Sequence, residues 1–222
     1  MSPRMDTGVH IRPYEPRDRA AVRKICADTA DAGHPVERFF PDREVIADLV
    51  TNYYTEFEPQ SSFVADNGSG VVGYLMGCLN TKRFVRVETC RIAPVVFVKA
   101  LVRGTLWHPQ AVRLFRTNIG MWLTTGYRAG QNLNEYPAHL HVNVQDGFRG
   151  QRAGQRLVEA FFEHARRAGV RGVHASVSAD NPRACHFFEG MGFIEVHREP
   201  RFRKTDGSST ILYTIIYARS LD

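Results

Sequence analysis

Paired cysteines and long apolar runs are both absent from this chain of 222 residues. The longest apolar run, Ala93 to Val98, is far too short to span a bilayer, and no apolar leader opens the chain. The four cysteines show no paired spacing, which favours free thiols in a reducing compartment over a disulfide framework: Cys26, Cys78, Cys90 and Cys185. We therefore expect one cytoplasmic domain over residues 1–222, long enough to bury a full core without staples.

The best-known phosphate and metal motifs are missing as well. No Gly-x-x-x-x-Gly-Lys-Ser/Thr string occurs, which excludes a P-loop, and no Gly-x-Gly-x-x-Gly fingerprint marks a dinucleotide site. His139 and His141 share one face of a predicted strand, but no carboxylate or cysteine stands beside them at ligand spacing. We expect no bound metal.

One segment nevertheless has the character of an anion site. A strand with alternating polarity, His139–Val144, leads into the basic turn Phe148–Gly154, and an amphipathic helix follows at once. The first N–H groups of a helix have no internal partner, and the helix dipole favours negative charge there. Arg149 and Arg152 add positive charge to this end. The turn is therefore predicted to bind a diphosphate.

The same turn resembles a loop of a known enzyme family. Arg149-Gly150-Gln151-Arg152-Ala153-Gly154 is similar to the pyrophosphate loop of the GCN5-related N-acetyltransferases, the GNAT superfamily, whose pattern is Arg/Gln-x-x-Gly-x-Gly/Ala. Arg149 and Gly154 occupy the first and last motif positions. The middle glycine is replaced by Arg152, a departure that matters only if that backbone must take a positive φ.

A second resemblance lies downstream, after a predicted strand over 173–178. Asn181 suits the N-cap and Pro182 the first turn of a helix, and residues 181–193 resemble the family's signature Asn-x-x-Ala-x-x-Phe-Tyr-x-x-x-Gly-Phe. The family resemblance extends from about Tyr136 to Val196. Residues 136–141 and 178–181 also look like the acetyltransferase-like domains appended to O-GlcNAcases and their free-standing bacterial relatives.

The remaining segments predict an order of elements that fits this family. The resemblance implies the GNAT fold, an α/β architecture with a mixed, mostly antiparallel sheet and helices on both faces. The expected elements are a strand at 11–13, helices from 16 and over 42–57, strands at 62–65 and 71–79, an insertion, a strand at 139–144, a helix from 154, a strand at 173–178, a helix from 182, and strands at 193–196 and 211–217.

The insertion, Thr81–Gly130, departs from the family pattern, which joins these two strands by a short turn. It carries nine basic residues and one acid, Glu88, or +8, whereas the chain carries +6, so the remainder sums to −2. We expect helices over Val95–Leu106 and Gln110–Leu123. Three large apolar side chains are expected to anchor them: Trp107, Phe115 and Trp122.

Several roles for the insertion stay open. It is interpreted as a helical cap over the acceptor side, as the interface of a homodimer, or as a basic surface for acidic substrate, nucleic acid or anionic membrane. No nucleic-acid-binding motif accompanies the charge, so nucleic acid and membrane are the least expected partners.

By resemblance, the expected reaction is acetyl transfer from acetyl-CoA to an amine, either a small molecule or a protein lysine or N-terminus, within a ternary complex. The resemblance places the turn Arg149–Gly154 on the diphosphate and Phe188 beside the thiol. It places four residues along the pantetheine arm, with the Val144 amide as donor to the thioester oxygen: Val142, Asn143, Val144 and Asn181.

The general acid is the weak point of this assignment. The family uses the tyrosine of its Phe-Tyr pair, and Phe188 stands at that position without a proton to give. His141, on the polar face of the cofactor strand, and Asp180, at the end of the next strand, are the catalytic candidates. Others are His139, Ser178 and Tyr136. Two function classes stay open: a working N-acetyltransferase, and an acyl-CoA-binding or interaction domain with little catalysis.

Overall fold

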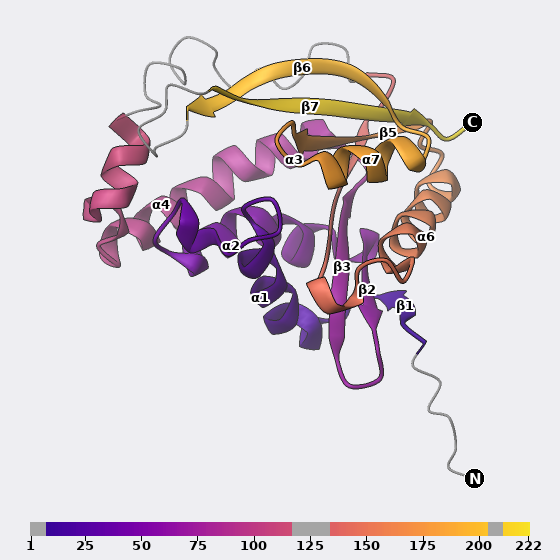
Figure 1. Cartoon of the computed structure of the whole chain (residues 1–222), viewed down its shortest axis with the longest axis horizontal. Helices are drawn as coiled ribbons and strands as arrows, with labels where there is room; N and C mark the ends of the chain where they lie inside the picture. Colours follow the sequence, from indigo (N-terminus) through magenta and orange to yellow (C-terminus); the bar gives the residue numbers. More distant parts are fainter. Residues whose placement is uncertain (1–7, 117–133, 204–210) are drawn as a thin grey trace.

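One seven-stranded sheet runs through the described part of the protein, which in this computed structural model comprises residues 8–116, 134–203 and 211–222. Its strand order is β1-β2-β3-β4-β5-β7-β6 (Figure 1). Neighbouring strands are antiparallel except for β4 and β5, which are parallel. The predicted mixed, mostly antiparallel sheet is confirmed.

The elements follow the predicted order. The strands are β1 His10–Pro13, β2 Ser62–Asp66, β3 Val71–Cys78, β4 Ala138–Val144, β5 Gly172–Ser178, β6 Ile194–Arg203 and β7 Ile211–Ser220. The helices are α1 Arg19–Thr29, α2 Arg43–Asn52, α3 Thr81–Val87, α4 Ala93–Val102, α6 Ala153–Arg167 and α7 Pro182–Gly190, and residues 109–116 are also helical.

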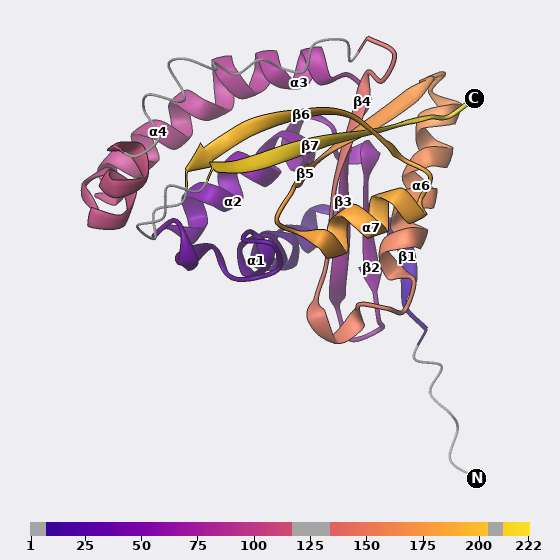
Figure 2. The same ribbon diagram turned by 45° about the horizontal axis from the view of Figure 1, so that its top comes forward.

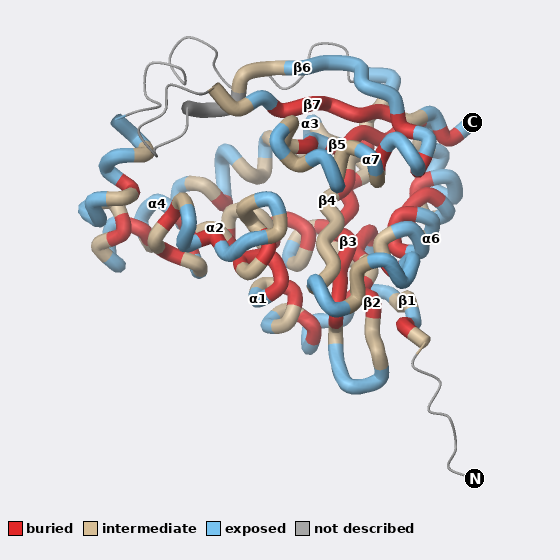
Figure 3. The backbone as a smooth tube through the Cα atoms, viewed as in Figure 1, coloured by how far each residue is buried: buried red, intermediate tan, exposed pale blue. Residues whose placement is uncertain are grey.

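Helices cover both faces of the sheet, and each face has its own apolar core (Figure 3). The stripe predicted on α6, including Leu157, Phe161 and Ala165, is fully buried against β1 to β4. A Cβ added to Gly77 on β3 would lie 2.2 Å from the Phe161 ring. The close approach of α6 to the sheet therefore requires glycine at this position. On the opposite face, α1 and α2 pack over Tyr74, Met76 and Cys78 of β3.

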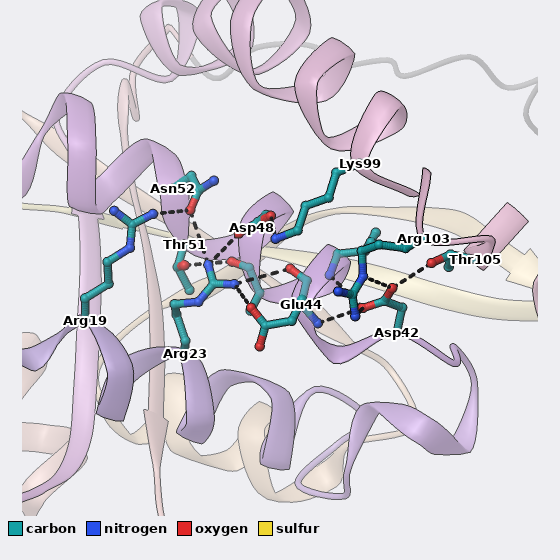
Figure 4. A network of polar contacts seen from close by, with 12 residues as sticks. Arg19, Arg23, Asp42, Glu44, Asp48, Thr51, Asn52, Lys99, Arg103 and Thr105 are labelled. Carbon is teal, nitrogen blue, oxygen red and sulfur yellow. Dashed lines mark hydrogen bonds and ion pairs between the residues drawn. The ribbon is translucent and has the colours of Figure 1, made fainter. Parts of the chain in front are cut away.

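Ion pairs join α1, α2 and α4 into one layer (Figure 4). Arg23 of α1 contacts Glu44 and Asp48 of α2 at 2.5 and 2.6 Å, and Lys99 of α4 reaches Asp48 at 2.5 Å. The described part of the insertion is thus tied to α2. This places it on the α1/α2 side of the sheet.

The insertion is helical, as predicted, but its elements differ from the prediction. The helix begins at Thr81, capped by Asn80, whose side chain accepts the Arg83 amide at 3.0 Å. It continues through a π-helical turn, Glu88–Ile92, into α4. The predicted start at Val95 is wrong because the π turn just before Pro94 lets the chain stay helical where proline removes a donor.

The three apolar side chains expected to anchor the insertion differ in their surroundings. Trp107 is 73 % exposed, so it does not anchor the insertion on this chain, and Phe115 is 36 % exposed. Trp122 and most of the predicted helix Gln110–Leu123 lie outside the described residues. The homodimer through residues 81–130 stays a prediction.

The last two strands form a hairpin longer than predicted. β6 continues past Val196 to Arg203 because β7 pairs with it along its whole length, through two register shifts. Propensity alone does not predict a strand over His197-Arg198-Glu199-Pro200. In Figure 1 this hairpin crosses above the α1/α2 layer, at a steep angle to β2 and β3.

Candidate functional site

The two parallel strands separate soon after they meet. β4 and β5 pair at Ala138↔Val173 and His139↔His174 and at no other positions in the described chain. Beyond these pairs β4 stays with β3 as far as Val144, while β5 stays with β7. The sheet therefore opens into a wedge whose closed end is at His139 and His174.

Backbone groups of β4 point into this wedge. The Gln145 amide donates to the Val72 carbonyl at 2.9 Å, so odd-numbered residues of β4 make the ladder bonds to β3. In an antiparallel pair the intervening residues point their N–H and C=O groups the other way. Leu140, Val142 and Val144 thus present a row of backbone groups to the opening.

At the open end of the wedge, β4 runs through the 149–154 turn into α6. Arg152 is the N-cap residue of α6 and has a left-handed backbone, with φ of +59°, and Gly150 has φ of +81°. The departure from glycine at position 152 therefore matters, because a side chain is forced into a conformation it disfavours. No described side chain caps α6, so the Ala153, Gly154 and Gln155 amides lack an intrahelical or side-chain acceptor.

The two arginines of the turn differ in their surroundings. The Arg149 guanidinium folds back, donating to the Val144 carbonyl at 2.9 Å and pairing with the Asp146 carboxylate. Its charge is therefore shared with an acid. Arg152 is exposed at the helix end.

A cavity of about 1580 Å³ connects this turn with the closed end of the wedge. This exceeds the roughly 300–1,000 Å³ of a site for one drug-sized ligand, so two molecules can meet in it. One wall is polar, formed by β4 and β5: His139, His141, Asn143, His174, Ser176 and Ser178. The wall supplied by α1, α2, α3, β7 and their loops is mainly apolar and includes Phe39, Leu49, Val50, Phe84 and Leu212.

All the residues predicted for the site, except Gln151 and the further candidate Tyr136, line this one cavity. Gln151 is exposed and turns its amide toward the Gly147 carbonyl at 3.4 Å. The Asn181 side chain caps α7 by accepting the Ala184 amide at 3.1 Å. The cavity thus brings the two predicted motifs together, while the role of each residue stays a prediction.

The two predicted catalytic side chains are both hydrogen-bonded. His141 Nε2 lies 3.1 Å from Asn143 Nδ2, which also donates to the Tyr74 hydroxyl at 3.0 Å. An amide nitrogen only donates, so His141 Nε2 is the acceptor. Asp180 is exposed and accepts the Ser178 hydroxyl at 2.6 Å. Asn181, and not Asp180, makes the helix cap.

Phe188 has no hydroxyl to offer and is buried. It packs edge-on against Phe193 and stacks on Tyr217, with ring centroids 5.1 and 6.3 Å away. The Tyr217 hydroxyl already donates to Glu189 at 2.9 Å. The α7 side of the cavity therefore supplies an apolar surface at this position.

Sequence reasoning missed a second polar group at the closed end of the wedge. The Tyr54 hydroxyl lies 2.8 Å from His139 Nε2, and the Thr81 hydroxyl lies 2.8 Å from His139 Nδ1. The apolar periodicity of residues 45–57 favours a core position for Tyr54. The available signal was the pair Tyr53-Tyr54, because consecutive residues lie about 100° apart on a helix and point in different directions.

Burial determines the charge of the histidines at this end. It lowers the pKa of His139 to about 3, aided by the neighbouring His174 and His141. Burial also lowers the pKa of His174, whose Nδ1 lies 2.8 Å from the Tyr136 carbonyl. Both rings are therefore neutral at pH 7.

The described residues contain neither a metal-binding cluster nor a membrane-spanning helix. No group of three or more histidine, cysteine, aspartate or glutamate side chains is arranged to hold a metal ion. Among the same residues, no helix has both the length and the apolar character needed to cross a membrane.

The chain is similar to several known proteins. The model of the Acetyltransferase (GNAT) family matches residues 123–193, which include β4, the 149–154 turn, α6, β5 and α7. The solved structure of SsHAT is 29% identical, with a TM-score of 0.73 over 96% of this chain and 98% of that one. An N-acetyltransferase from Staphylococcus aureus Mu50 is 13% identical, with a TM-score of 0.60 over 97% and 99% of the two chains.

Curated relatives include much longer proteins. The Protein O-GlcNAcase of Rattus norvegicus is 20% identical over 194 residues, or 87% of this chain, and the chain spans 21% of its length. The N-alpha-acetyltransferase 30 of Saccharomyces cerevisiae is 23% identical over 133 residues, 50% of this chain and 76% of that protein. The fold, the splayed strands and these matches agree: the chain belongs to the GNAT acetyltransferase family and is distantly homologous to a region of the O-GlcNAcases.

Proposed function

We propose that the protein is an N-acetyltransferase that moves an acetyl group from acetyl-CoA to an amine by direct attack in a ternary complex. The observation that carries this proposal is the wedge between β4 and β5. It joins an uncapped helix N-terminus to a row of backbone groups and to a cavity with room for a second molecule. The structure of yncA from Salmonella typhimurium with its cofactor Acetyl-CoA shares the fold at 14% identity and a TM-score of 0.56.

The residues present fit acetyl-CoA in two places. The Ala153, Gly154 and Gln155 amides and exposed Arg152 suit the diphosphate, because they direct donors and positive charge to one point. The backbone groups of Leu140, Val142 and Val144 suit the amides of the pantetheine arm. That strand covers roughly 13 Å from Val144 to Leu140, so an arm laid along it ends near His139.

The acceptor amine is proposed to enter from the α1/α2 side. The odd-numbered side chains of β4 face that side, since their partners on β3, among them Tyr74 and Met76, lie in the α1/α2 core. The amine must lose a proton and the departing thiolate must gain one. His141 and Asp180, which line the cavity, are the sequence-based candidates for these two proton transfers.

A second function is favoured by one specific observation. Phe188 cannot donate a proton, and this suits an acyl-CoA-binding or interaction module of the same fold with little catalysis. The two functions share the cofactor site and differ in turnover.

Two measurements test these proposals. Titration calorimetry with CoA should show binding that Arg152→Glu weakens strongly, because a carboxylate replaces a cation beside the phosphates, whereas Gln151→Glu one residue earlier should weaken it less. Unchanged affinity in Arg152→Glu would refute the placement of the diphosphate. Thiol release from acetyl-CoA across a panel of small amines and peptides, with Asp180→Asn beside the wild type, then separates an enzyme from a binding module.

A further inference from the structure

We propose that Tyr54 is the residue that relays the proton during acetyl transfer, held in place by His139 and Thr81. This inference rests on the proposed function. It starts from a chemical need, since the position expected to supply a proton is Phe188, which has none. Tyr54 lines the same cavity from the opposite side of the opened sheet, within the π-helical turn Tyr53–Phe57 that extends α2.

The location of Tyr54 is the first argument. Its hydroxyl is 2.8 Å from His139, and His139 belongs to the last pair of residues that joins β4 to β5. An arm laid along β4 from the 149–154 turn therefore ends beside this hydroxyl. Tyr54 also belongs to the α1/α2 core, on the side from which the amine is proposed to enter.

The second argument is that His139 can hold the phenol in two proton arrangements. A neutral imidazole has one donor and one acceptor nitrogen. In one arrangement the Thr81 hydroxyl donates to the Pro137 carbonyl at 2.9 Å, His139 Nδ1 donates to Thr81, and Tyr54 donates to Nε2. In the other, Thr81 turns its proton to Nδ1, and Nε2–H donates to Tyr54. The Thr81 amide keeps the Pro137 carbonyl satisfied in both, at 2.8 Å.

The reaction uses the Nε2 side of both arrangements, while Nδ1 keeps the proton that it donates to Thr81. In the first, Tyr54 presents lone pairs that can accept a proton, and in the second it can direct its own proton into the cavity. The heavy atoms need not move between them. The Thr81 hydroxyl, at the start of α3, and the His139 ring, on β4, are both held in place. They therefore allow the Tyr54 hydroxyl to change from proton acceptor to proton donor.

The transfer step balances without another reactant. As the nitrogen–carbon bond forms, the nitrogen becomes cationic and gives its proton to Tyr54 Oη, while the phenol proton passes to His139 Nε2. As the carbon–sulfur bond breaks, the proton on His139 returns to Tyr54 and the phenol proton passes to the leaving sulfur. Tyr54 and His139 end as they began. Because burial disfavours a charged His139, its protonated form is short-lived and returns the proton readily.

Tyr54→Phe and Tyr53→Phe form a matched pair of variants. The Tyr53 hydroxyl donates to Glu58 at 2.8 Å, and Tyr53 does not line the cavity. Each variant removes one buried phenol hydroxyl from the same turn, so their thermal stabilities should fall alike. Tyr54→Phe should lower kcat by about 10²-fold or more at neutral pH, with the affinity for acetyl-CoA little changed, whereas Tyr53→Phe should keep the wild-type kcat.

Thr81 provides a test of positioning. Thr81→Val keeps the shape but removes the partner of His139 Nδ1, so kcat should fall and recover partly at high pH, where free amine and bulk base replace the relay. Thr81→Ser restores the hydroxyl and should restore both the rate and the neutral-pH profile.

The possible outcomes separate this inference from the proposed function. If the wild type transfers acetyl groups and Tyr54→Phe matches Tyr53→Phe in kcat, the relay is refuted and the acetyltransferase stands. If the wild type binds acetyl-CoA but acetylates no amine or peptide of the panel, both the relay and the acetyltransferase are refuted. If acetyl-CoA does not bind, the cofactor placement itself is wrong.

Discussion

Arg152 places a positive charge at the start of α6 but requires an unfavourable backbone conformation. The first turn of α6 needs a left-handed residue there, and glycine adopts that backbone without strain. Arginine pays a steric penalty of about 1–2 kcal/mol in this region. Its exposed guanidinium lies at the positive end of the α6 dipole. The arginine therefore lowers the stability of the fold but strengthens the attraction of an anionic ligand.

Replacing this residue separates the two effects. We expect Arg152→Gly to raise the free energy of unfolding by up to about 1 kcal/mol, since the relieved strain exceeds the extra chain entropy that glycine loses on folding. Arg152→Ala removes the charge but keeps the Cβ, so it should show no such gain. Urea denaturation of the three proteins makes this comparison. Equal stability of the alanine and glycine variants would show that the backbone at 152 is not strained.

Glu88 is an acid placed where its charge is poorly solvated. Its Oε2 atom is buried without a hydrogen-bond partner in the described chain, and burial raises the pKa of Glu88 to about 7. Ionisation is easier in the unfolded chain, where the pKa is near 4.5. The group therefore favours folding at low pH and costs stability progressively as pH rises from about 4.5 to 7.

This linkage predicts a pH-dependent effect of Glu88→Gln. At pH 8 the substitution should raise Tm by a few degrees because it removes a buried charge, and by pH 5 the difference should have largely disappeared. Glu163→Gln on the exposed surface of α6 is the control, with no comparable pH trend expected. Scanning calorimetry of the wild type and both variants at the two pH values measures this difference in Tm. A gain in Tm that does not depend on pH would contradict the raised pKa of Glu88.

At the scale of elements, Asp42 joins α2 to the insertion. It caps α2 through the Glu44 and Val45 amides and also accepts Arg103 at 2.7 Å and Thr105 at 2.6 Å. Burial acts to raise the pKa of Asp42, but the bonds from Arg103, Thr105 and Val45 outweigh it and bring the pKa down to about 2. Its contribution is complete above pH 3.8 and is lost as pH falls toward 2.

Two substitutions at this position separate the cap from the ion pair. Asp42→Asn keeps a good N-cap but loses the charge opposite Arg103, whereas Asp42→Ala loses both. We expect alanine to be less stable than asparagine by about 1 kcal/mol at pH 7. The wild type should lose part of its advantage over Asp42→Asn between pH 4 and about 2. Denaturant titrations at these pH values test both statements, and equal stability of the two variants would exclude a capping role.

The elements also show what a sequence can and cannot specify. Periodicity predicted α6 well, since its apolar stripe coincides with what the sheet buries. It also predicted the second helix, although α2 packs mainly against α1 and α4 and buries Asp48 and Thr51 as well as apolar residues. The sequence predicts the first insertion helix from Val95, whereas the chain is helical from Thr81 through a π turn that leads past Pro94. It predicts a strand that ends at Val196, whereas pairing with β7 extends β6 to Arg203.

Some residues of the candidate site could be predicted from the sequence and others could not. The 149–154 turn was predictable from its basic residues between a strand and an amphipathic helix, although Arg152 does not suit its left-handed backbone, and Asn181 was predictable as a helix cap. The Tyr54–His139–Thr81 group was not, because it joins three residues up to 85 positions apart along the chain. No local pattern encodes such a contact.

At the scale of the whole molecule, the sheet consists of two halves with a weak junction. Two pairs of residues join β4 to β5, whereas β3 pairs with β4 over six residues and β5 with β7 over seven. The views in Figures 1 and 2 show the β6–β7 hairpin crossing over the half formed by β1 to β4. A ligand in the wedge would touch both halves, so its binding is expected to couple them.

Hydrogen exchange measures this coupling directly. Without ligand, the amides of Val142 and Val144 should exchange faster than those of Tyr74 and Met76 on β3, because they lie beyond the last pair that joins β4 to β5 and have no partner strand on the wedge side. Adding CoA should slow exchange at the wedge amides and at the first turn of α6, since both gain acceptors, while β2 and β3 change little. The variant Arg152→Glu serves as the control, because weakened binding should abolish the protection at the same CoA concentration. Protection spread evenly over the sheet, or confined to α1 and α2, would show that CoA does not occupy the wedge.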